Sequence, residues 1–225
     1  MSIPLEDNAA DIRTKAQRGG LRLNEKALRE LATWYPERRN LPGLVMFTTP
    51  YGDLLVNSYV ITDGNEAAAF DTGTDCSEML KHPIRQIFLT HAHGDHIMDL
   101  PRLKKATGAP VFIGDREDFH EAEKFAAGKE FAIGNLKVET RLTCGHTRGG
   151  ITYVVHGLEH PVAVVGDAMF AGSMGGGLVS YADAIRTNRE QILILPDDTI
   201  LCCGHGPLTT VGEEKIHNPF FSNAS

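Results

Sequence analysis

Short apolar runs alternate with polar breaks that contain glycine or proline along most of the chain. Runs that are rich in β-branched and aromatic residues, and that end at such breaks, are typical of β-strands. We therefore predict strands over residues 44–49, 54–62, 67–70, 86–90, 111–113, 136–143, 151–156, 161–166 and 199–203.

Between these runs, apolar residues recur at the three- and four-residue spacing of amphipathic helices. This spacing predicts helices over residues 24–34, 96–107, 115–127 and 181–195. Strands and helices are interleaved in two halves, each with several strands followed by helix–strand units. The order predicts an α/β (α+β) fold in which two mixed β-sheets stack face to face with outer helices, a four-layer αβ/βα sandwich.

The chain has 225 residues, enough to bury one large core. We predict an N-terminal extension over residues 1–40, with a loose polar arm over residues 1–20 before the helix, and one domain over residues 41–225. The first twenty residues contain acidic side chains near the N-terminus and no apolar stretch, so we expect no secretory signal peptide. No apolar run has the length of a membrane span.

Composition narrows the expected partners. Apolar residues make up 42% and charged residues 23% of the chain, as in ordinary globular proteins. The net charge of −7 argues against a nucleic-acid surface or a polybasic membrane contact. We expect a small-molecule substrate, no nucleic acid and no membrane, and a homodimer is compatible with the sequence. The four cysteines lack CxxC spacing, which favours reduced thiols in a cytoplasmic protein.

The densest chemical signal is the segment His91-Ala-His93-Gly-Asp95-His96, at the end of the predicted strand 86–90. Three imidazoles and a carboxylate within six residues are typical of metal ligands rather than of a core. His91 and His93 could converge on one ion, while Asp95 and His96 turn the other way and could hold a second. The alternative is a polar loop that carries histidines by chance.

Three further polar residues, His146, Asp167 and His205, stand beside glycines at the ends of later strands. The carboxyl ends of strands are where the sites of layered α/β proteins are assembled. Each residue alone would more often be a turn residue or a packed histidine. Together with the histidine cluster, they indicate one site.

On these motifs the chain resembles the metallo-β-lactamase-fold superfamily of hydrolases. The matching motifs, in the family's order, are Asp71-Thr72-Gly73, His91-x-His93-x-Asp95-His96, Gly145-His146-Thr147, Gly166-Asp167 and Gly204-His205-Gly206. Within the superfamily, the chain is similar to the hydroxyacylglutathione hydrolase (glyoxalase II)-like branch. The segment 166–170 and the tail 204–220 carry that closer similarity.

The resemblance implies two metal ions and seven ligands. These are His91, His93 and His146 on metal 1, Asp95, His96 and His205 on metal 2, and Asp167 bridging both. Asp71 would be a supporting carboxylate that orients a ligand histidine. All seven donors are nitrogen or oxygen, which suits Zn²⁺ first and iron or manganese as alternatives.

The implied function is a dinuclear metal-dependent hydrolase. Asp167 would hold a metal-bridging hydroxide, because metal binding lowers the pKa of water to about 7. That hydroxide would attack a thioester, ester or lactone. Asp95, a ligand that could also relay a proton, and Asp167 are therefore the catalytic residues that we expect.

Two departures from glyoxalase II leave the substrate open. Residues 171–177 replace an expected arginine-bearing loop, and 20 residues after His205 are too few for the glutathione-binding helical region. Three other functions stay open. They are a mononuclear-iron sulfur dioxygenase, similar to persulfide dioxygenases and using His91, His146 and Asp167; a phosphodiesterase on the same fold; and a non-catalytic metal-binding protein.

The other candidates have weaker signals. We interpret five histidines as surface or packing residues, namely His82, His120, His156, His160 and His217. Cys144 could face the site two residues before His146, but simple packing is the better interpretation. Arg148 and the glycines 175–177 are candidates for shaping a substrate pocket, and the glycines could equally form a plain turn.

Overall fold

The computed structural model describes residue 36 and residues 39–222. The predicted arm over residues 1–20 and the predicted helix over residues 24–34 lie outside the described residues. The boundary between an extension over 1–40 and a domain over 41–225 therefore stays a prediction.

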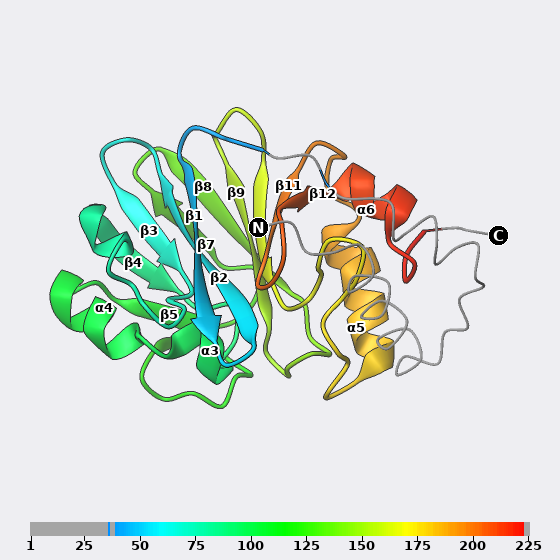
Figure 1. Ribbon diagram of the computed structural model, residues 1–225, viewed down its shortest axis with the longest axis horizontal. Coiled ribbons are helices and arrows are strands. Elements are labelled where there is room, and N and C mark those ends of the chain that lie inside the picture. The colour runs from blue at the N-terminus through cyan, green and yellow to red at the C-terminus, as the bar shows by residue number, and fades with distance from the viewer. Residues whose placement is uncertain (1–35, 37–38, 223–225) are drawn as a thin grey trace.

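Within the described residues, twelve strands form two six-stranded sheets (Figure 1). The first sheet, in spatial order, contains β1 (Leu44–Tyr51), β2 (Leu54–Thr62), β3 (Ala67–Phe70), β4 (Ile84–Phe88), β5 (Val111–Gly114) and β6 (Glu123–Phe125). The second contains β12 (Thr209–Thr210), β11 (Ile200–Cys203), β10 (Val162–Gly166), β9 (Ile151–His156), β8 (Leu136–Leu142) and β7 (Glu130–Ile133).

Both sheets are mixed, and the strand directions decide where the polar motifs gather. In the first sheet, β3 and β4 pair in parallel. In the second, β10 and β11 pair in parallel, and β8 runs the same way because both β8 and β10 are antiparallel to β9. The carboxyl ends of these strands therefore lie together at one edge of each sheet, and that is where the chain carries its histidines and aspartates.

Four α-helices and two short helical turns connect the strands in the described part of the chain. They are the 3₁₀ turn η1 (Met79–Lys81), α3 (Gly94–Ile97), α4 (Leu100–Thr107), α5 (Tyr181–Thr187), the π-helical turn η2 (Asn188–Ile192) and α6 (Val211–His217). Figure 1 shows α4 outside the first sheet and α5 and α6 outside the second. Gly108 ends α4 in the left-handed conformation, with φ 65°.

Three apolar layers hold the sandwich together. Between the sheets, Tyr59 and Phe70 pack with Tyr153 and other inward-facing residues of the second sheet. Outward-facing residues of the first sheet pack against α4, and those of the second against α5 and α6. Successive residues of a strand point to opposite faces, so strands buried on both faces read as continuous apolar runs. The predicted four-layer arrangement is confirmed.

Two buried tyrosines cross between the sheets just before the polar motifs. The Tyr153 hydroxyl, on the second sheet, donates to the Leu89 carbonyl at 2.8 Å. In the opposite direction, the Tyr59 hydroxyl of the first sheet donates to the Cys203 carbonyl at 2.6 Å. Each bond ties one sheet to the backbone two residues before a histidine of the other.

The predicted helix over residues 115–127 is wrong. Residues 115–122 form turns and bends, and β6 follows them and pairs in parallel with β5. The apolar spacing is helical, but Phe125 is buried in the core between the sheets, so long-range packing outweighs local periodicity. The predicted helix over 96–107 is divided into α3 and α4, and that over 181–195 ends at Ile192. The elements β7, β12 and α6 are additions to the predicted set.

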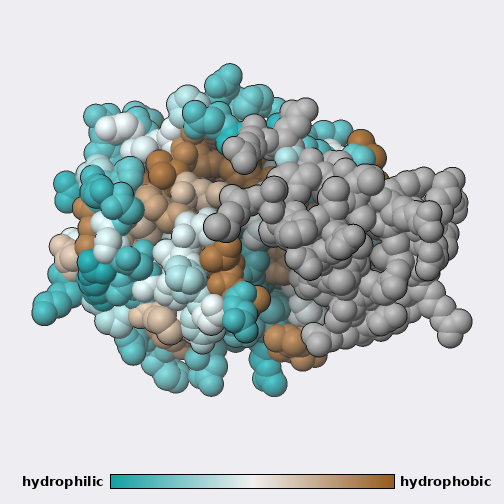
Figure 2. Space-filling model, in the orientation of Figure 1, coloured by the Kyte–Doolittle hydropathy of each residue, from teal (hydrophilic) through white to brown (hydrophobic). Residues whose placement is uncertain are grey.

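The described surface in Figure 2 is mostly hydrophilic, with hydrophobic residues gathered near the middle of this face. Four of the exposed large hydrophobic residues lie on β1 and β2, namely Met46, Tyr51, Leu54 and Leu55. Across residues 36 and 39–222, the helices are too short and too polar to cross a membrane.

Candidate metal centre

The predicted ligands converge where the strand ends of the two sheets meet. His91 and His93 follow β4, and Asp95 and His96 lie in α3 directly afterwards. From the second sheet, three residues complete the set, namely His146 after β8, Asp167 after β10 and His205 after β11. The structure thus brings all seven predicted residues together, in two donor groups that each draw on both sheets.

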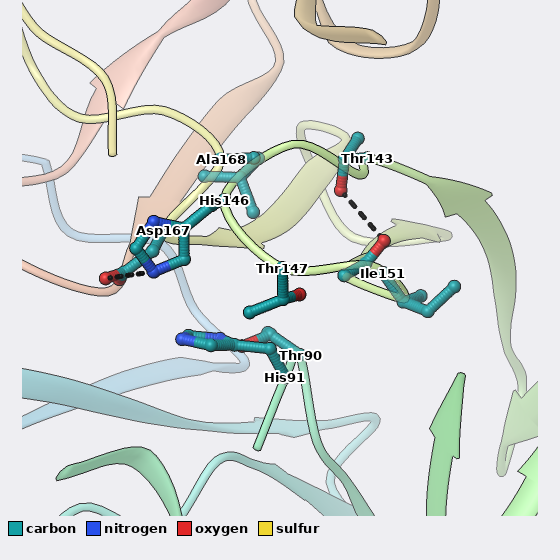
Figure 3. A pocket seen from close by; sticks show the side chains of 10 residues that line it. Thr90, His91, Thr143, His146, Thr147, Ile151, Asp167 and Ala168 are labelled. Atoms are coloured by element: carbon teal, nitrogen blue, oxygen red, sulfur yellow. Dashed lines mark hydrogen bonds and ion pairs between the residues drawn. The ribbon is translucent and has the colours of Figure 1, made fainter. Parts of the chain in front are cut away.

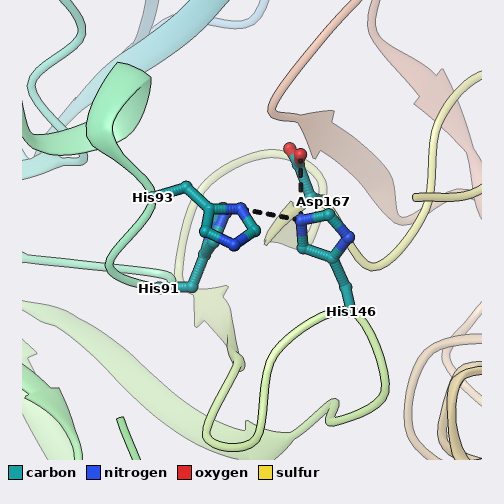
Figure 4. Close-up of side chains that lie close together, drawn as sticks. All are labelled: His91, His93, His146 and Asp167. Carbon is teal, nitrogen blue, oxygen red and sulfur yellow. Dashed lines mark hydrogen bonds and ion pairs between the residues drawn. The ribbon is translucent and has the colours of Figure 1, made fainter. Parts of the chain in front are cut away.

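The first donor group contains His91, His93, His146 and Asp167, with one donor atom of each within 4.8 Å of the others (Figure 4). Nδ1 of His93 lies 3.0 Å from Nε2 of His91 and 3.0 Å from Nε2 of His146. Oδ2 of Asp167 lies 3.4 Å from Nε2 of His146. Four tetrahedral ligands at 2.0–2.1 Å from a zinc ion would be roughly 3.3 Å apart, so the spacing fits such an ion.

The second donor group contains Asp95, His96 and His205. Nε2 of His205 lies 3.3 Å from Oδ2 of Asp95, and Nε2 of His96 lies 3.7 Å from the same oxygen. Asp167 stands between the groups, because its Oδ1 is 3.2 Å from His96 and its Oδ2 is 3.5 Å from His205. One carboxylate therefore faces both sets of imidazoles.

Two buried atoms at the centre lack a hydrogen-bond partner among the described residues. They are Nε2 of His96 and Oδ1 of Asp167, which face each other without the alignment of a hydrogen bond. Leaving buried polar atoms unpaired is costly unless another partner satisfies them. A cation between the two atoms would be such a partner, so the residues present fit the ions that the sequence implies.

The second-sheet histidines are oriented by backbone carbonyls. Nδ1 of His146 donates to the Gly176 carbonyl at 2.9 Å, and Nδ1 of His205 donates to the Leu55 carbonyl at 2.6 Å. A ring nitrogen that donates in this way leaves the other nitrogen free to bind a metal. In both rings, that other nitrogen is the Nε2 atom that faces Asp167.

Asp71 holds the His96 ring and Thr90 from the first sheet, in a left-handed backbone conformation. It is the single non-glycine residue with a positive φ, 56°, in the described part of the chain, and it is 1% exposed. Its carboxylate accepts hydrogen bonds from the amide and hydroxyl of Thr90, each at 2.8 Å, and lies 2.8 Å from Nδ1 of His96. The Thr90 hydroxyl also lies 3.0 Å from Nδ1 of His91.

Burial and neighbouring charge act in opposite directions on the pKa values of the site. Burial lowers the pKa of His91 well below its ordinary value. Burial also disfavours charge on His96, but the carboxylates of Asp71 and Asp167 outweigh it and raise the pKa of His96 well above its ordinary value. Asp167 shows the converse, because burial is outweighed by His96 and His205, and its pKa lies well below the usual range. The centre therefore keeps Asp167 ionised.

Two glycines allow the chain to approach Asp167 closely. A Cβ at Gly204 would overlap the Asp167 carboxylate and the His96 ring, and a Cβ at Gly175 would overlap the Asp167 carbonyl. Gly176 also supplies the carbonyl that holds His146. The run 175–177 thus supports the ligands, a role that sequence reasoning did not assign to it.

A small cavity lies beside the first donor group (Figure 3). Its lining includes His91, His146 and Asp167, together with the threonines Thr90, Thr143 and Thr147. The Thr147 hydroxyl is buried and has no hydrogen-bond partner within the described residues. The cavity has room for about one water molecule, which this hydroxyl could bind.

The remaining histidines lie outside both donor groups of the described residues, as predicted. His120, for example, has an 86% exposed side chain beside Asp118, and His156 lies near Glu139. Cys144 is half-buried and also outside the groups, while Arg148 is exposed. Sequence reasoning assigned no role to Thr90, whose amide and hydroxyl hold the Asp71 carboxylate.

Comparison with known proteins gives consistent results. The model of the Metallo-beta-lactamase superfamily matches residues 51–205, a range that contains both donor groups. A probable metallo-hydrolase of Bacillus subtilis (strain 168), YqgX, is 27% identical over 209 residues, which cover 78% of this chain and 97% of that protein. Hydroxyacylglutathione hydrolase GloC of Haemophilus influenzae is 27% identical over 199 residues, which cover 75% of this chain and 93% of that protein.

The fold has matches among solved structures. The crystal structure of BLEG-1, a B3 metallo-beta-lactamase, superimposes with a TM-score of 0.67 at 27% identity. The superposition covers 80% of this chain and 100% of that chain. The two-sheet sandwich is therefore shared with a protein of known structure.

Proposed function

Because the chain belongs to the metallo-beta-lactamase superfamily and is a metallo-hydrolase with a His/Asp metal site, we propose that it is a dinuclear enzyme acting on a thioester, ester or lactone. The observation that carries the proposal is the position of Asp167. Its two carboxylate oxygens face imidazoles of both donor groups. A carboxylate in this position suits a ligand shared by two ions.

In this proposal, the first donor group holds one ion and the second donor group holds the other. Imidazole and carboxylate donors without thiolates suit zinc, and also iron or manganese. The ions supply, when bound, a water that is acidic enough to act as a nucleophile near neutral pH and positive charge for the developing oxyanion. Zinc is the ion that we propose first.

The protein's own residues position this chemistry. Asp71 fixes the His96 ring through Nδ1, and Gly176 and Leu55 fix the rings of His146 and His205 through their carbonyls. Burial raises the pKa of Asp95, but His205 and His96 outweigh burial, so this pKa lies below the usual range. Asp95 is thus ionised and is the group that we propose to accept a proton during hydrolysis.

The substrate that we propose is a small molecule with an apolar part. Leu54 and Leu55 are each 57% exposed, and the Leu55 carbonyl holds the His205 ring, which places this apolar hairpin beside the second donor group. Apolar side chains at the rim of a site favour an apolar acyl or alcohol group. The Haemophilus influenzae relative is called a hydroxyacylglutathione hydrolase, so a thioester is the first substrate class to test.

Metal analysis and an activity panel test the proposal together. Protein purified without chelator should contain two ions per chain and should hydrolyse a member of a panel of thioesters, esters and lactones. The variant Asp167→Asn should lose at least one ion per chain and most activity. The variant Asp198→Asn, at a 59% exposed carboxylate, is the matched control and should keep both.

Other outcomes would contradict the proposal in different ways. A single iron per chain with oxygen consumption on a persulfide would favour the sulfur dioxygenase, which would use His91, His146 and Asp167. Hydrolysis restricted to phosphodiesters would favour the phosphodiesterase. A metal-loaded protein that hydrolyses none of these substrates and consumes no oxygen would be a binding protein.

A further inference from the structure

Glu117 is a buried carboxylate that belongs to neither donor group. It lies in the turn between β5 and β6 and is 6% exposed. Oε1 accepts a hydrogen bond from the Gly149 amide at 2.9 Å, and Oε2 accepts one from the Ala92 amide at 3.3 Å. A buried carboxylate is tolerated when such bonds satisfy it.

The two amides belong to the two loops that carry the imidazoles of the first donor group. Ala92 stands between His91 and His93, and Gly149 lies three residues after His146. One side chain therefore connects the loop after β4, in the first sheet, with the loop after β8, in the second. We propose that Glu117 is a positioning residue that sets the separation of these loops and so the spacing of the three imidazoles, an inference that rests on the ligand roles proposed above.

The backbone around Glu117 is itself fixed. Its amide donates to the Gly114 carbonyl at 3.1 Å, and Nζ of Lys124 donates to its carbonyl at 2.7 Å. A Cβ at Gly149 would overlap the Glu117 amide, and a Cβ at Gly114 would overlap the Gly149 carbonyl. Backbone therefore packs on backbone at the Gly149 loop, and from this fixed position the carboxylate reaches the Ala92 amide of the other loop.

The second donor group gives an internal comparison. The ring of His96 is held by Asp71, and that of His205 by the Leu55 carbonyl. Neither contact involves Glu117. A positioning role for Glu117 thus predicts that the protein loses affinity for one of the two ions. A general loss of stability would lower the affinity for both.

The test compares Glu117→Gln and Glu117→Ala with wild type in the full chain. Glutamine keeps the shape of the side chain but presents an NH₂ group to one of the two backbone amides. It should therefore lower the affinity for one ion and preserve folding. Alanine removes both bonds. Asp118→Asn is the matched control, because the neighbouring Asp118 side chain is 99% exposed.

The readouts are the two stepwise affinities for Co²⁺, the visible spectrum of the cobalt protein, and kcat and KM of the loaded enzyme. We expect Glu117→Ala to weaken one Co²⁺ step by about 10- to 100-fold, as loss of a residue that supports ligands does, and to leave the other within about twofold. Glu117→Gln should lie between alanine and wild type. The cobalt spectrum should change in the weakened step, and Asp118→Asn should match wild type.

Three results would overturn the inference. The first is unchanged Co²⁺ affinities and spectra in both Glu117 variants. The second is an equal loss at both steps together with a lower melting temperature of the metal-free protein, which would mark Glu117 as a general structural residue. The third is a wild-type protein that binds no Co²⁺, which would overturn the proposed function as well and is thereby distinguished from the other two.

Discussion

Nδ1 of His96 lies 2.8 Å from Oδ2 of Asp71, and the two side chains are 0% and 2% exposed. The contact fixes which ring nitrogen of His96 carries the proton toward Asp71, and it turns Nε2 toward Asp167. Asp71, which belongs to neither donor group, thus selects the tautomer and the orientation of the His96 ring.

The variant Asp71→Asn should bind the ion of the second donor group about 10- to 100-fold more weakly, because His96 loses its carboxylate partner. Asparagine tolerates the positive φ of this position, so folding should persist. Elemental analysis after dialysis against a weak chelator measures the loss. Asp75→Asn, at a 58% exposed carboxylate, is the control, and equal metal content in both variants would contradict the role of Asp71.

Gly204→Ala should abolish metal binding at both donor groups, because the Cβ of the alanine would overlap the Asp167 carboxylate that lies between them. The matched control is Gly176→Ala, where a Cβ would make ordinary contact with Leu178 and where the carbonyl that holds His146 is kept. Isothermal titration with Zn²⁺ compares the two proteins. A Gly204 variant that binds two ions like wild type would show that the close approach is unimportant.

The ligands of the site could be predicted from the sequence more completely than the helices and strands could. His91, Asp167 and His205 each stand beside or near a glycine at the end of an apolar run, and strand ends of parallel strands meet at one edge. The helix predicted over 115–127 was wrong because Phe125 packs between the sheets and Glu117 bonds to two distant loops, and apolar spacing reports neither contact. Those contacts are tertiary and leave no local pattern.

The sequence carries a local signal for α6. Thr210 caps the N-terminus of this helix: its hydroxyl accepts a hydrogen bond from the Glu213 amide at 3.3 Å and donates one to the Glu213 carboxylate at 3.0 Å. Thr-x-x-Glu is the pattern of a capping box, so this helix could have been predicted. The two-residue strand β12 before it has no comparable signature, because so short a strand exists through its pairing with β11.

Tyr153→Phe should destabilise the fold by about 1–3 kcal/mol, since it removes the hydroxyl that donates to the buried Leu89 carbonyl. Tyr59→Phe should cost less, about 0.5–1.5 kcal/mol, because the Cys203 carbonyl still accepts from the Asn57 side-chain amide at 3.1 Å. Urea unfolding of the metal-free protein measures the change. Tyr51→Phe is the control, because the Tyr51 side chain is exposed. Losses below about 0.5 kcal/mol for both buried tyrosines would show that the crossing bonds do not hold the sheets together.

Glu214 predicts a pH dependence of stability away from the metal centre. It is fully buried and accepts hydrogen bonds from the Gly172 amide and the side chains of Asn218 and Thr209. Burial is the largest effect and raises its pKa from 4.5 to about 7. The folded state therefore binds this proton more tightly than the unfolded state, and the contribution to stability is full below pH 4.5 and is lost as pH rises to about 7.

The difference between wild type and Glu214→Gln isolates this contribution. Wild type should lose up to about 1.4 kcal/mol per pH unit relative to the variant across that window, because glutamine does not titrate. Urea unfolding at several pH values from 4.5 to 8 gives the two curves. Glu78→Gln, at a 64% exposed carboxylate, should run parallel to wild type, and a Glu214→Gln curve that does so too would contradict the raised pKa.

Each donor group takes ligands from both sheets, so neither half of the chain can complete an ion site by itself. A nascent chain that has formed the first sheet holds four of the seven side chains and must wait for the second sheet to be synthesised and docked. Ions that bind only the docked form stabilise it by an amount that rises with their free concentration. The lifetime of this protein in a cell should therefore follow the supply of its metal, because a chain without ions opens more often between its sheets and is then cleaved by proteases.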